Sequence, residues 1–179
     1  VLQSVLPALA LAPEPSTLVI EGGTHNPASP PFDFLARALA PLLHRMGVGL
    51  ELSLERPGYY PAGGGKLVAR VTPVAKLRPL FLHERGEVTV RRATALVSHI
   101  PGDVAVRERD VMLSTLGWDA SCGHVVTRRD SIGPGNVAMV EVGSEHVTEL
   151  FTAFGEKSVP AERVADEVAR RSLYYISSG

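Results

Sequence analysis

The sequence has one cysteine, no excess of charge of either sign and no long uninterrupted apolar run, and each absence excludes a class of protein. The lone Cys122 cannot close a disulfide within the chain, which favours a reducing compartment and predicts a cytoplasmic location. The apolar runs are broken by proline or charged residues well short of the roughly 18 to 20 residues that a membrane-spanning helix needs. No membrane partner is therefore expected.

The charge balance argues against a protein that wraps long nucleic acids. The 179 residues carry 18 basic and 19 acidic side chains, whereas neutralising many phosphates requires a positive stripe. A protein that holds only one end of a nucleic acid needs few phosphate contacts and is not excluded. Exposed basic pairs are usually solvated surface, and this is the favoured interpretation of Arg91-Arg92, Arg128-Arg129 and Arg170-Arg171.

Six histidines raise the question of a metal site. None of them has HxxxH spacing and there is no CxxC motif, so only Cys122 and His124 offer two potential ligands close together. Structural or surface roles are favoured, and no role is assigned to His25. The set is His25, His44, His83, His99, His124 and His146.

Hydrophobic periodicity predicts strands that alternate with helices, and so an α/β or α+β fold. A helix is expected to begin after an N-cap at Ser29, to kink at Pro41 and to stop at Gly47. A buried strand is expected at 16–20. Further helices are expected at 1–12, 102–116 and from 161 onward, and further strands at 49–55, 66–72, 80–83, 87–100, 118–127, 137–142 and 148–154.

Glycine-rich segments can bind phosphate through backbone donors, but here the signal is weak. Gly63-Gly64-Gly65 lacks the GxxxxGK[ST] pattern, and a strand pattern rather than a helix follows it. A tight hairpin connection between two strands is the favoured interpretation. The same holds for Gly22-Gly23 and for Gly133-Pro134-Gly135, where glycine permits a positive φ at a turn.

Four segments together resemble the RNA 3'-terminal phosphate cyclase family. They are IEGGTHNPASPPFDFLARALAPLL at 20–43, RPGYYPAGGG at 56–65, SIGPGN at 131–136 and SEHVTELFTAFGEKSV at 144–159. The resemblance implies a βαβαββ repeat like the C-terminal domain of translation initiation factor three, plus a smaller inserted α/β domain. It assigns 1–75 to the repeated domain, 76–158 to the inserted domain and 159–179 to a helix leading back.

The resemblance also implies a reaction. Members use ATP and a divalent cation, Mg or Mn, to convert an RNA with a 3'-terminal phosphate to a 2',3'-cyclic phosphate through a protein-histidine adenylate and an RNA-adenylate. The family's Gly-rich N-terminal segment and its nucleophilic histidine are not found between Val1 and Gly179. The chain is therefore expected to be the central portion of the enzyme and, alone, to form no covalent adduct with AMP.

Three residues match positions that the resemblance assigns to nucleotide binding. Gln3, in a VLQS segment, is expected to contact ATP, although without the resemblance it would be a helix-surface residue. Pro30 and Phe34 are expected to form one wall of an adenine pocket, against an equally supported alternative in which they begin a helix and fill its core. Asp33 in the first helical turn is explained by the helix dipole and needs no catalytic role.

Two other functions remain open at this point. A non-catalytic relative of the cyclases serves in ribosome assembly, and the retained Gln3 and Pro30–Phe34 loop favour the enzyme over it. An enolpyruvyl-transferase-like enzyme would share the repeated architecture but would not explain the quoted segments.

Overall fold

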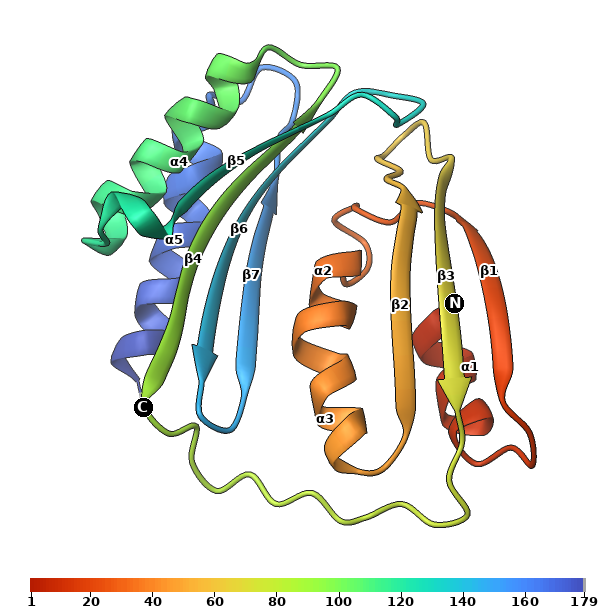
Figure 1. Cartoon of the computed structure of the whole chain (residues 1–179). Helices are drawn as coiled ribbons and strands as arrows, with labels where there is room; N and C mark the ends of the chain where they lie inside the picture. Colours follow the sequence, from red (N-terminus) through yellow and green to blue (C-terminus); the bar gives the residue numbers. More distant parts are fainter. Residues whose placement is uncertain (179) are drawn as a thin grey trace.

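Two separate β-sheets and the helices packed on them make up the computed structural model, which describes residues 1–178 (Figure 1). The elements in chain order are α1 (Leu2–Ala10), β1 (Ser16–Gly22), α2 (Phe32–Phe34), η1 (Leu35–Leu39), α3 (Ala40–Arg45), β2 (Gly49–Arg56), β3 (Gly65–Thr72), β4 (Val88–Ser98), α4 (Gly102–Leu116), η2 (Ala120–Cys122), β5 (Gly123–Arg128), β6 (Gly135–Ser144), β7 (Thr148–Phe154) and α5 (Ala161–Ser177).

The first sheet has three antiparallel strands in the order β1-β3-β2. Side chains alternate between its faces, so Leu50, Leu67 and Val71 point into one core together with apolar residues of α1, η1 and α3. The prediction of a buried strand at 16–20 was wrong, because no residue of β1 is buried. Alternate residues of β1 face away from the helices, and Val19 is 59% exposed.

The second sheet has four strands in the order β5-β4-β6-β7, with β4 parallel to β5 and the other pairs antiparallel. Helices α4 and α5 cover one face, where Met112, Val140 and Val168 are fully buried. The parallel pair β4 and β5 is joined by α4, because a parallel connection must cross over the sheet. Helix α5 also packs on this sheet, because Val164, Ala165 and Val168 share the core with Val140 of β6.

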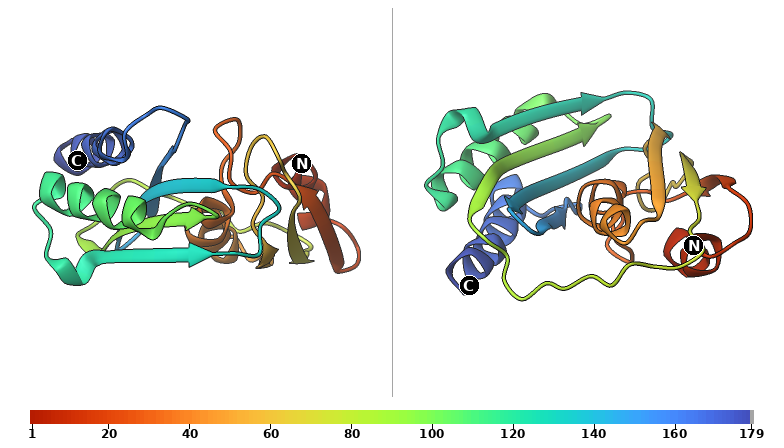
Figure 2. Two further views of the ribbon diagram at one scale, coloured as in Figure 1. Left: turned by 90° about the horizontal axis from the view of Figure 1, so that it is seen from above. Right: turned by 60° about the horizontal axis from the view of Figure 1, so that its bottom comes forward.

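The helical segment α2–η1–α3 lies between the two sheets (Figures 1 and 2). Phe34 contacts the core of the first sheet and also the second core formed by Leu96, Met139 and Leu150 on the opposite face of the four-stranded sheet. One short helix is thus shared by two cores. The clefts described below open beside its N-terminal end.

The middle of this segment, η1, is a π-helical turn that ends at Leu39, two residues before Pro41. Proline has no N–H, so the carbonyl of Arg37 lacks the donor that an α-helix would supply four residues later. The predicted kink therefore takes the form of a widened, π-helical turn. Proline and π-helical turns are both known causes of a local change in helix geometry.

Three local predictions were wrong. Pro31 rather than Ser29 precedes the helix, and the Ser29 hydroxyl instead donates to Oδ1 of Asn26 at 3.3 Å. No strand forms at Leu80–His83, because this part of the long β3–β4 connection has no neighbouring strand to pair with. The strand expected from Trp118 begins only at Gly123, since Asp119 caps a short helical turn before it.

Other predictions were confirmed. The helix at 102–116 has the expected bounds and ends at Gly117, whose φ of +63° is the left-handed conformation that glycine adopts readily. Gly63 and Gly64 have φ of +66° and +68° in the hairpin connection between β2 and β3. The α/β class is confirmed, whereas the likeness to initiation factor three and the domain boundaries stay predictions.

Candidate functional site

A buried histidine, His25, lies in the loop that follows β1. His25 is 1% exposed, and both of its ring nitrogens have partners: Nδ1 lies 2.8 Å from Oγ1 of Thr24 and Nε2 lies 3.0 Å from Oδ2 of Asp33. The Thr24 hydroxyl also accepts a hydrogen bond of 3.0 Å from the backbone N–H of Gly58. The loop after β1 is therefore fastened both to the β2–β3 connection and to helix α2.

The network continues through ion pairs that connect the helical segment α2–η1–α3 to the four-stranded sheet. Arg37 donates to Oδ1 of Asp33 at 2.9 Å and to Oε2 of Glu141, on β6, also at 2.9 Å. Arg92 on β4 approaches the same carboxylate at 3.4 Å. Because Asp33 and Glu141 are largely buried, these pairs are weakly screened by solvent.

Opposing effects act on the carboxyl group of Asp33. Burial by itself would raise its pKa, but the hydrogen bond and charge of His25, together with the charge of Arg37, hold the pKa below its ordinary value. Asp33 is therefore an ionised, positioned carboxylate rather than only a helix-dipole residue.

Tyr59 packs beside this network. Its ring centroid lies 5.6 Å from that of His25, and the side chain is 3% exposed. A Cβ at Gly135 would lie 2.1 Å from the Tyr59 ring, so only glycine at position 135 allows the ring to approach the backbone of β6. Burial raises the pKa of Tyr59 to about 12, and the phenol therefore stays protonated at neutral pH.

A cleft of about 990 Å³, here called the large cleft, opens beside His25 and Tyr59. Its wall combines the β2–β3 connection, the N-terminal half of α4, the start of β6 and the segment from Phe154 to α5. Its lining includes Tyr60, Glu108, Asn136, Gly155 and Lys157. This volume suits a nucleotide-sized ligand.

A buried pair lies in the wall of the large cleft. Glu108 is 0% exposed, and its Oε2 accepts a hydrogen bond of 2.9 Å from Nδ2 of Asn136. The second oxygen of Glu108 and Oδ1 of Asn136 have no hydrogen-bond partner among residues 1–178. Burial raises the pKa of Glu108 from an ordinary 4.5 to about 7, although the Asn136 bond and the charge of Arg107 act in the opposite direction.

A second cleft, of about 550 Å³, adjoins the large one. Pro30 and Phe34, both expected in a nucleotide pocket, line this second cleft together. Pro27, Phe154 and Glu156 line both clefts and so form their common border. Gln3 lies elsewhere, exposed on α1, and lines neither cleft. The nucleotide-binding roles of the three residues stay predictions.

Sequence reasoning missed the polar residues of the site. His25 and Asp33 were left without a joint role, although their spacing across Pro30-Pro31 could have suggested a loop folded back on a helix. Nothing in the sequence signals that Glu108 faces Asn136, because they are 28 positions apart and each lies in an unremarkable pattern. Within residues 1–178, no group of three His, Cys, Asp or Glu side chains could hold a metal ion, and no helix is long and apolar enough to cross a bilayer.

The comparisons with known proteins agree on one family. The family model described as RNA 3'-terminal phosphate cyclase matches residues 1–173. The chain therefore belongs to this family. Similar proteins named RNA 3'-terminal phosphate cyclase occur in Koribacter versatilis, at 49% identity over 99% of this chain and 50% of that protein, and in Ectopseudomonas mendocina, at 48% identity over 100% and 52%. The chain spans about half the length of these relatives.

The Asp33 network predicts a large loss of stability when its carboxylate is removed. Asp33→Asn leaves His25 and Arg37 without their buried partner, and we expect the free energy of unfolding in urea to fall by about 3 kcal/mol at neutral pH. The control is Asp110→Asn, an exposed carboxylate paired with Arg109, which should change it by less than about 0.5 kcal/mol. Because the folded-state pKa of Asp33 is depressed, the wild-type advantage is present above the unfolded value of about 4 and is lost as pH falls below it. Equal losses in both variants would contradict the network.

The raised pKa of Glu108 predicts that the free energy of unfolding depends on pH in the opposite direction to the effect of Asp33. Its folded-state pKa of about 7 exceeds the ordinary 4.5, so between these values the folded protein holds a proton that the unfolded chain has released. The free energy of unfolding should therefore fall as pH rises through this window. We expect Glu108→Gln to gain on the order of 2 kcal/mol over wild type between about pH 5 and about pH 8 in urea unfolding. Glu14→Gln, an exposed control, should show no such trend, and a flat Glu108→Gln difference would refute the shift.

Proposed function

We propose that the protein containing this chain converts an RNA 3'-terminal phosphate to a 2',3'-cyclic phosphate at the expense of ATP. The observation that carries the proposal is the pair of adjoining clefts, with Pro30 and Phe34 in one and a nucleotide-sized space in the other. Two nucleotides that exchange an adenylyl group must meet with their phosphates adjacent. Family membership and the names of the relatives support the same reaction.

The proposed reaction has three steps. A histidine, which the resemblance assigns to a segment outside Val1 to Gly179, attacks the α-phosphorus of ATP, and pyrophosphate leaves. An oxygen of the RNA 3'-phosphate then attacks the same phosphorus, and the histidine leaves. Finally the adjacent 2'-hydroxyl attacks the activated 3'-phosphorus, loses its proton and displaces AMP. Holding the ribose in one conformation supplies the proximity for this last step.

The contribution of the described residues is binding and orientation. In the second cleft, the rigid ring of Pro30 and the aromatic ring of Phe34 offer an apolar wall for adenine. The ion pairs of Asp33 and Arg37 fix the helix that carries Phe34, so this wall does not need to reorganise when ATP binds. The divalent cation would neutralise the triphosphate, but residues 1–178 present no cluster of ligands for it, and no step is assigned to protein-bound metal.

The reaction itself can be tested on the protein expressed from the complete open reading frame. With ATP and Mg or Mn, a 3'-phosphorylated oligoribonucleotide should become resistant to phosphatase and lose the mass of one water, with one AMP released for each cyclic end. The same RNA with a 3'-hydroxyl should remain unchanged. Binding of RNA with no cyclisation and no AMP release would reject the enzyme and favour the non-catalytic relative.

Gln3 gives a test of the ATP site. Because its side chain is exposed on α1, Gln3→Ala should leave the free energy of unfolding unchanged while removing a hydrogen bond to nucleotide. A net hydrogen bond contributes about 1 kcal/mol, so the Kd for ATP should rise roughly fivefold by calorimetry. The neighbouring Ser4→Ala, also exposed, is the matched control and should bind ATP like wild type. An unchanged Kd in Gln3→Ala would remove this residue from the site.

A further inference from the structure

We propose that the large cleft receives the 3'-terminal nucleotide of the RNA, with its base on Tyr60, a hydrogen-bond donor directed to Asn136 and its 3'-phosphate near Lys157. The inference rests on the proposed function, because it names the place where that function would hold its RNA. It concerns a subsite distinct from the second cleft, to which Pro30 and Phe34 belong.

The first support is a buried hydrogen-bond acceptor, Oδ1 of Asn136, that has no partner among residues 1–178 and lies beside a glycine. Asn136 is 7% exposed, and its Nδ2 is engaged by Glu108, so its Oδ1 is turned away from that carboxylate and lacks a partner among residues 1–178. A Cβ at Gly155 would lie 2.5 Å from this oxygen. The φ of Gly155 is not in the left-handed region, so it is space beside Asn136, not backbone conformation, that favours glycine here. Buried acceptors are rarely left unpaired, and a ligand donor would satisfy this one.

The second support is an aromatic ring left in solvent at the same cleft. Tyr60 is 77% exposed, yet it lines the large cleft next to the fully packed Tyr59. A largely exposed aromatic ring can serve as a stacking platform, because every nucleobase has an apolar face of similar size. The apolar side chains of Ile100, Val104 and Phe154 line the same cleft and provide further contact surface.

The third support is the placement of positive charge. Lys157 is exposed, lines the large cleft and forms no ion pair within residues 1–178. Arg107 also lines this cleft but is engaged, with Glu162 at 2.9 Å and Asp103 at 3.9 Å. Lys157 follows Glu156, which borders both clefts. A phosphate held by Lys157 would therefore lie at the border where an adenylyl group from the second cleft could reach it.

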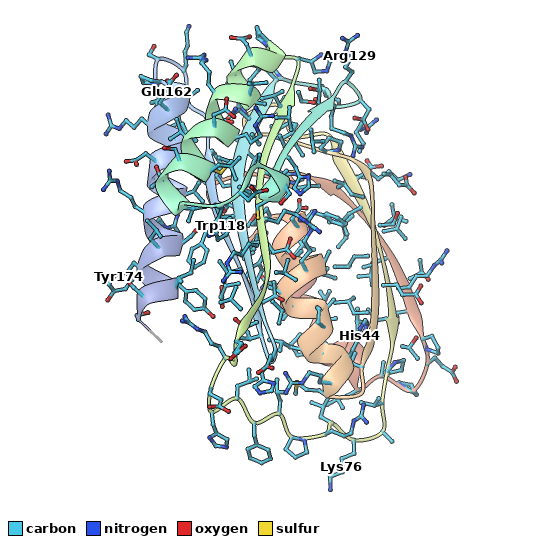
Figure 3. The ribbon with its side chains drawn as sticks, turned by 60° about the vertical axis from the view of Figure 1, so that its left-hand side comes forward. His44, Lys76, Trp118, Arg129, Glu162 and Tyr174 are labelled. Carbon is cyan, nitrogen blue, oxygen red and sulfur yellow. The ribbon has the colours of Figure 1, made fainter. Side chains whose placement is uncertain are left out.

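The base-stacking part is tested by fluorescence anisotropy with a short, 5'-labelled, 3'-phosphorylated oligoribonucleotide and the product of the complete open reading frame, without ATP. We expect Tyr60→Ala to raise the Kd about tenfold. The matched control is Tyr174→Ala, a tyrosine with the same 77% exposure near the other end of α5 from Glu162, well away from the cleft (Figure 3). It should bind like wild type. No loss in Tyr60→Ala, or an equal loss in Tyr174→Ala, would overturn the inference.

The phosphate and the acceptor are tested separately. Lys157→Gln should weaken binding of the 3'-phosphorylated RNA several-fold and leave binding of the 3'-hydroxyl RNA unchanged, whereas Lys76→Gln, at the far end of the molecule, should alter neither (Figure 3). Gly155→Ala should weaken both RNAs, because its methyl group enters the space beside Asn136. Equal effects of Lys157→Gln on the two RNAs would contradict the placement of the phosphate.

Competition with ATP distinguishes the two nucleotides. If the large cleft holds RNA, a non-hydrolysable ATP analogue should not displace the oligoribonucleotide, and Tyr60→Ala should leave the Kd of that analogue unchanged. Displacement, with an equal loss of analogue binding in Tyr60→Ala, would make the large cleft the ATP site and overturn the inference. A protein that binds RNA through Tyr60 but does not cyclise it would reject the proposed function alone. One that cyclises RNA with a KM insensitive to Tyr60→Ala would reject this inference alone.

Discussion

The structure depends on a short helix that belongs to two cores at once. Segment α2–η1–α3 buries Leu35 against the three-stranded sheet and brings Phe34 to the four-stranded sheet, while Arg37 extends the connection to Glu141 by an ion pair. A charge at the contact between the helix and the sheet destabilises the fold unless it is paired. Arg37 pairs with Asp33 in its own helical segment and with Glu141 on β6. The position of one sheet relative to the other is therefore fixed by specific charges, not only by apolar contact, whose direction is not specified.

This constraint also explains where the clefts lie. At the N-terminal end of the shared helix the chain consists of loops, and residues of these loops line both clefts. Three glycines bring these loops together: a Cβ on Gly58 would lie 2.3 Å from the backbone nitrogen of Gly65 and 2.4 Å from the carbonyl oxygen of Gly22. The backbone there is close-packed while the side-chain space beyond it stays open. Closely packed backbone beneath an open cleft suits a site that binds ligands without large rearrangement.

Local sequence patterns correctly predicted the features that neighbouring residues determine. The bounds of α4 follow from Pro101 before it and Gly117 after it, and the alternation in β3 follows from burial of one face. Predictions failed where the deciding partner was distant or ambiguous: Asn26 attracted the hydroxyl expected to cap the helix, and the apolar run at Leu80–His83 found no strand to pair with. The site was harder still. Asp33 acquires its role through His25 and Arg37, and Arg37 through a residue 104 positions away, which no periodicity reveals. Pro30 and Phe34 were selected through family resemblance, and their sharing of one cleft is a fact of the fold.

The near-neutral charge of the chain can be related to how its arginines are paired and to how a ligand would be held. Most arginines near the two sheets are engaged, with Arg37 and Arg92 on Glu141 and Arg128 on Asp130, so they serve the fold and contribute little field to solvent. A ligand held by a broad positive surface would lose affinity steeply with salt. A ligand held by one exposed ring, one lysine and a buried amide would lose far less, because stacking and hydrogen bonding release no counterions. If the cleft beside Tyr60 holds a single RNA nucleotide as proposed, a near-neutral charge over these residues is the expected composition, because shape and a few directed contacts would supply the recognition.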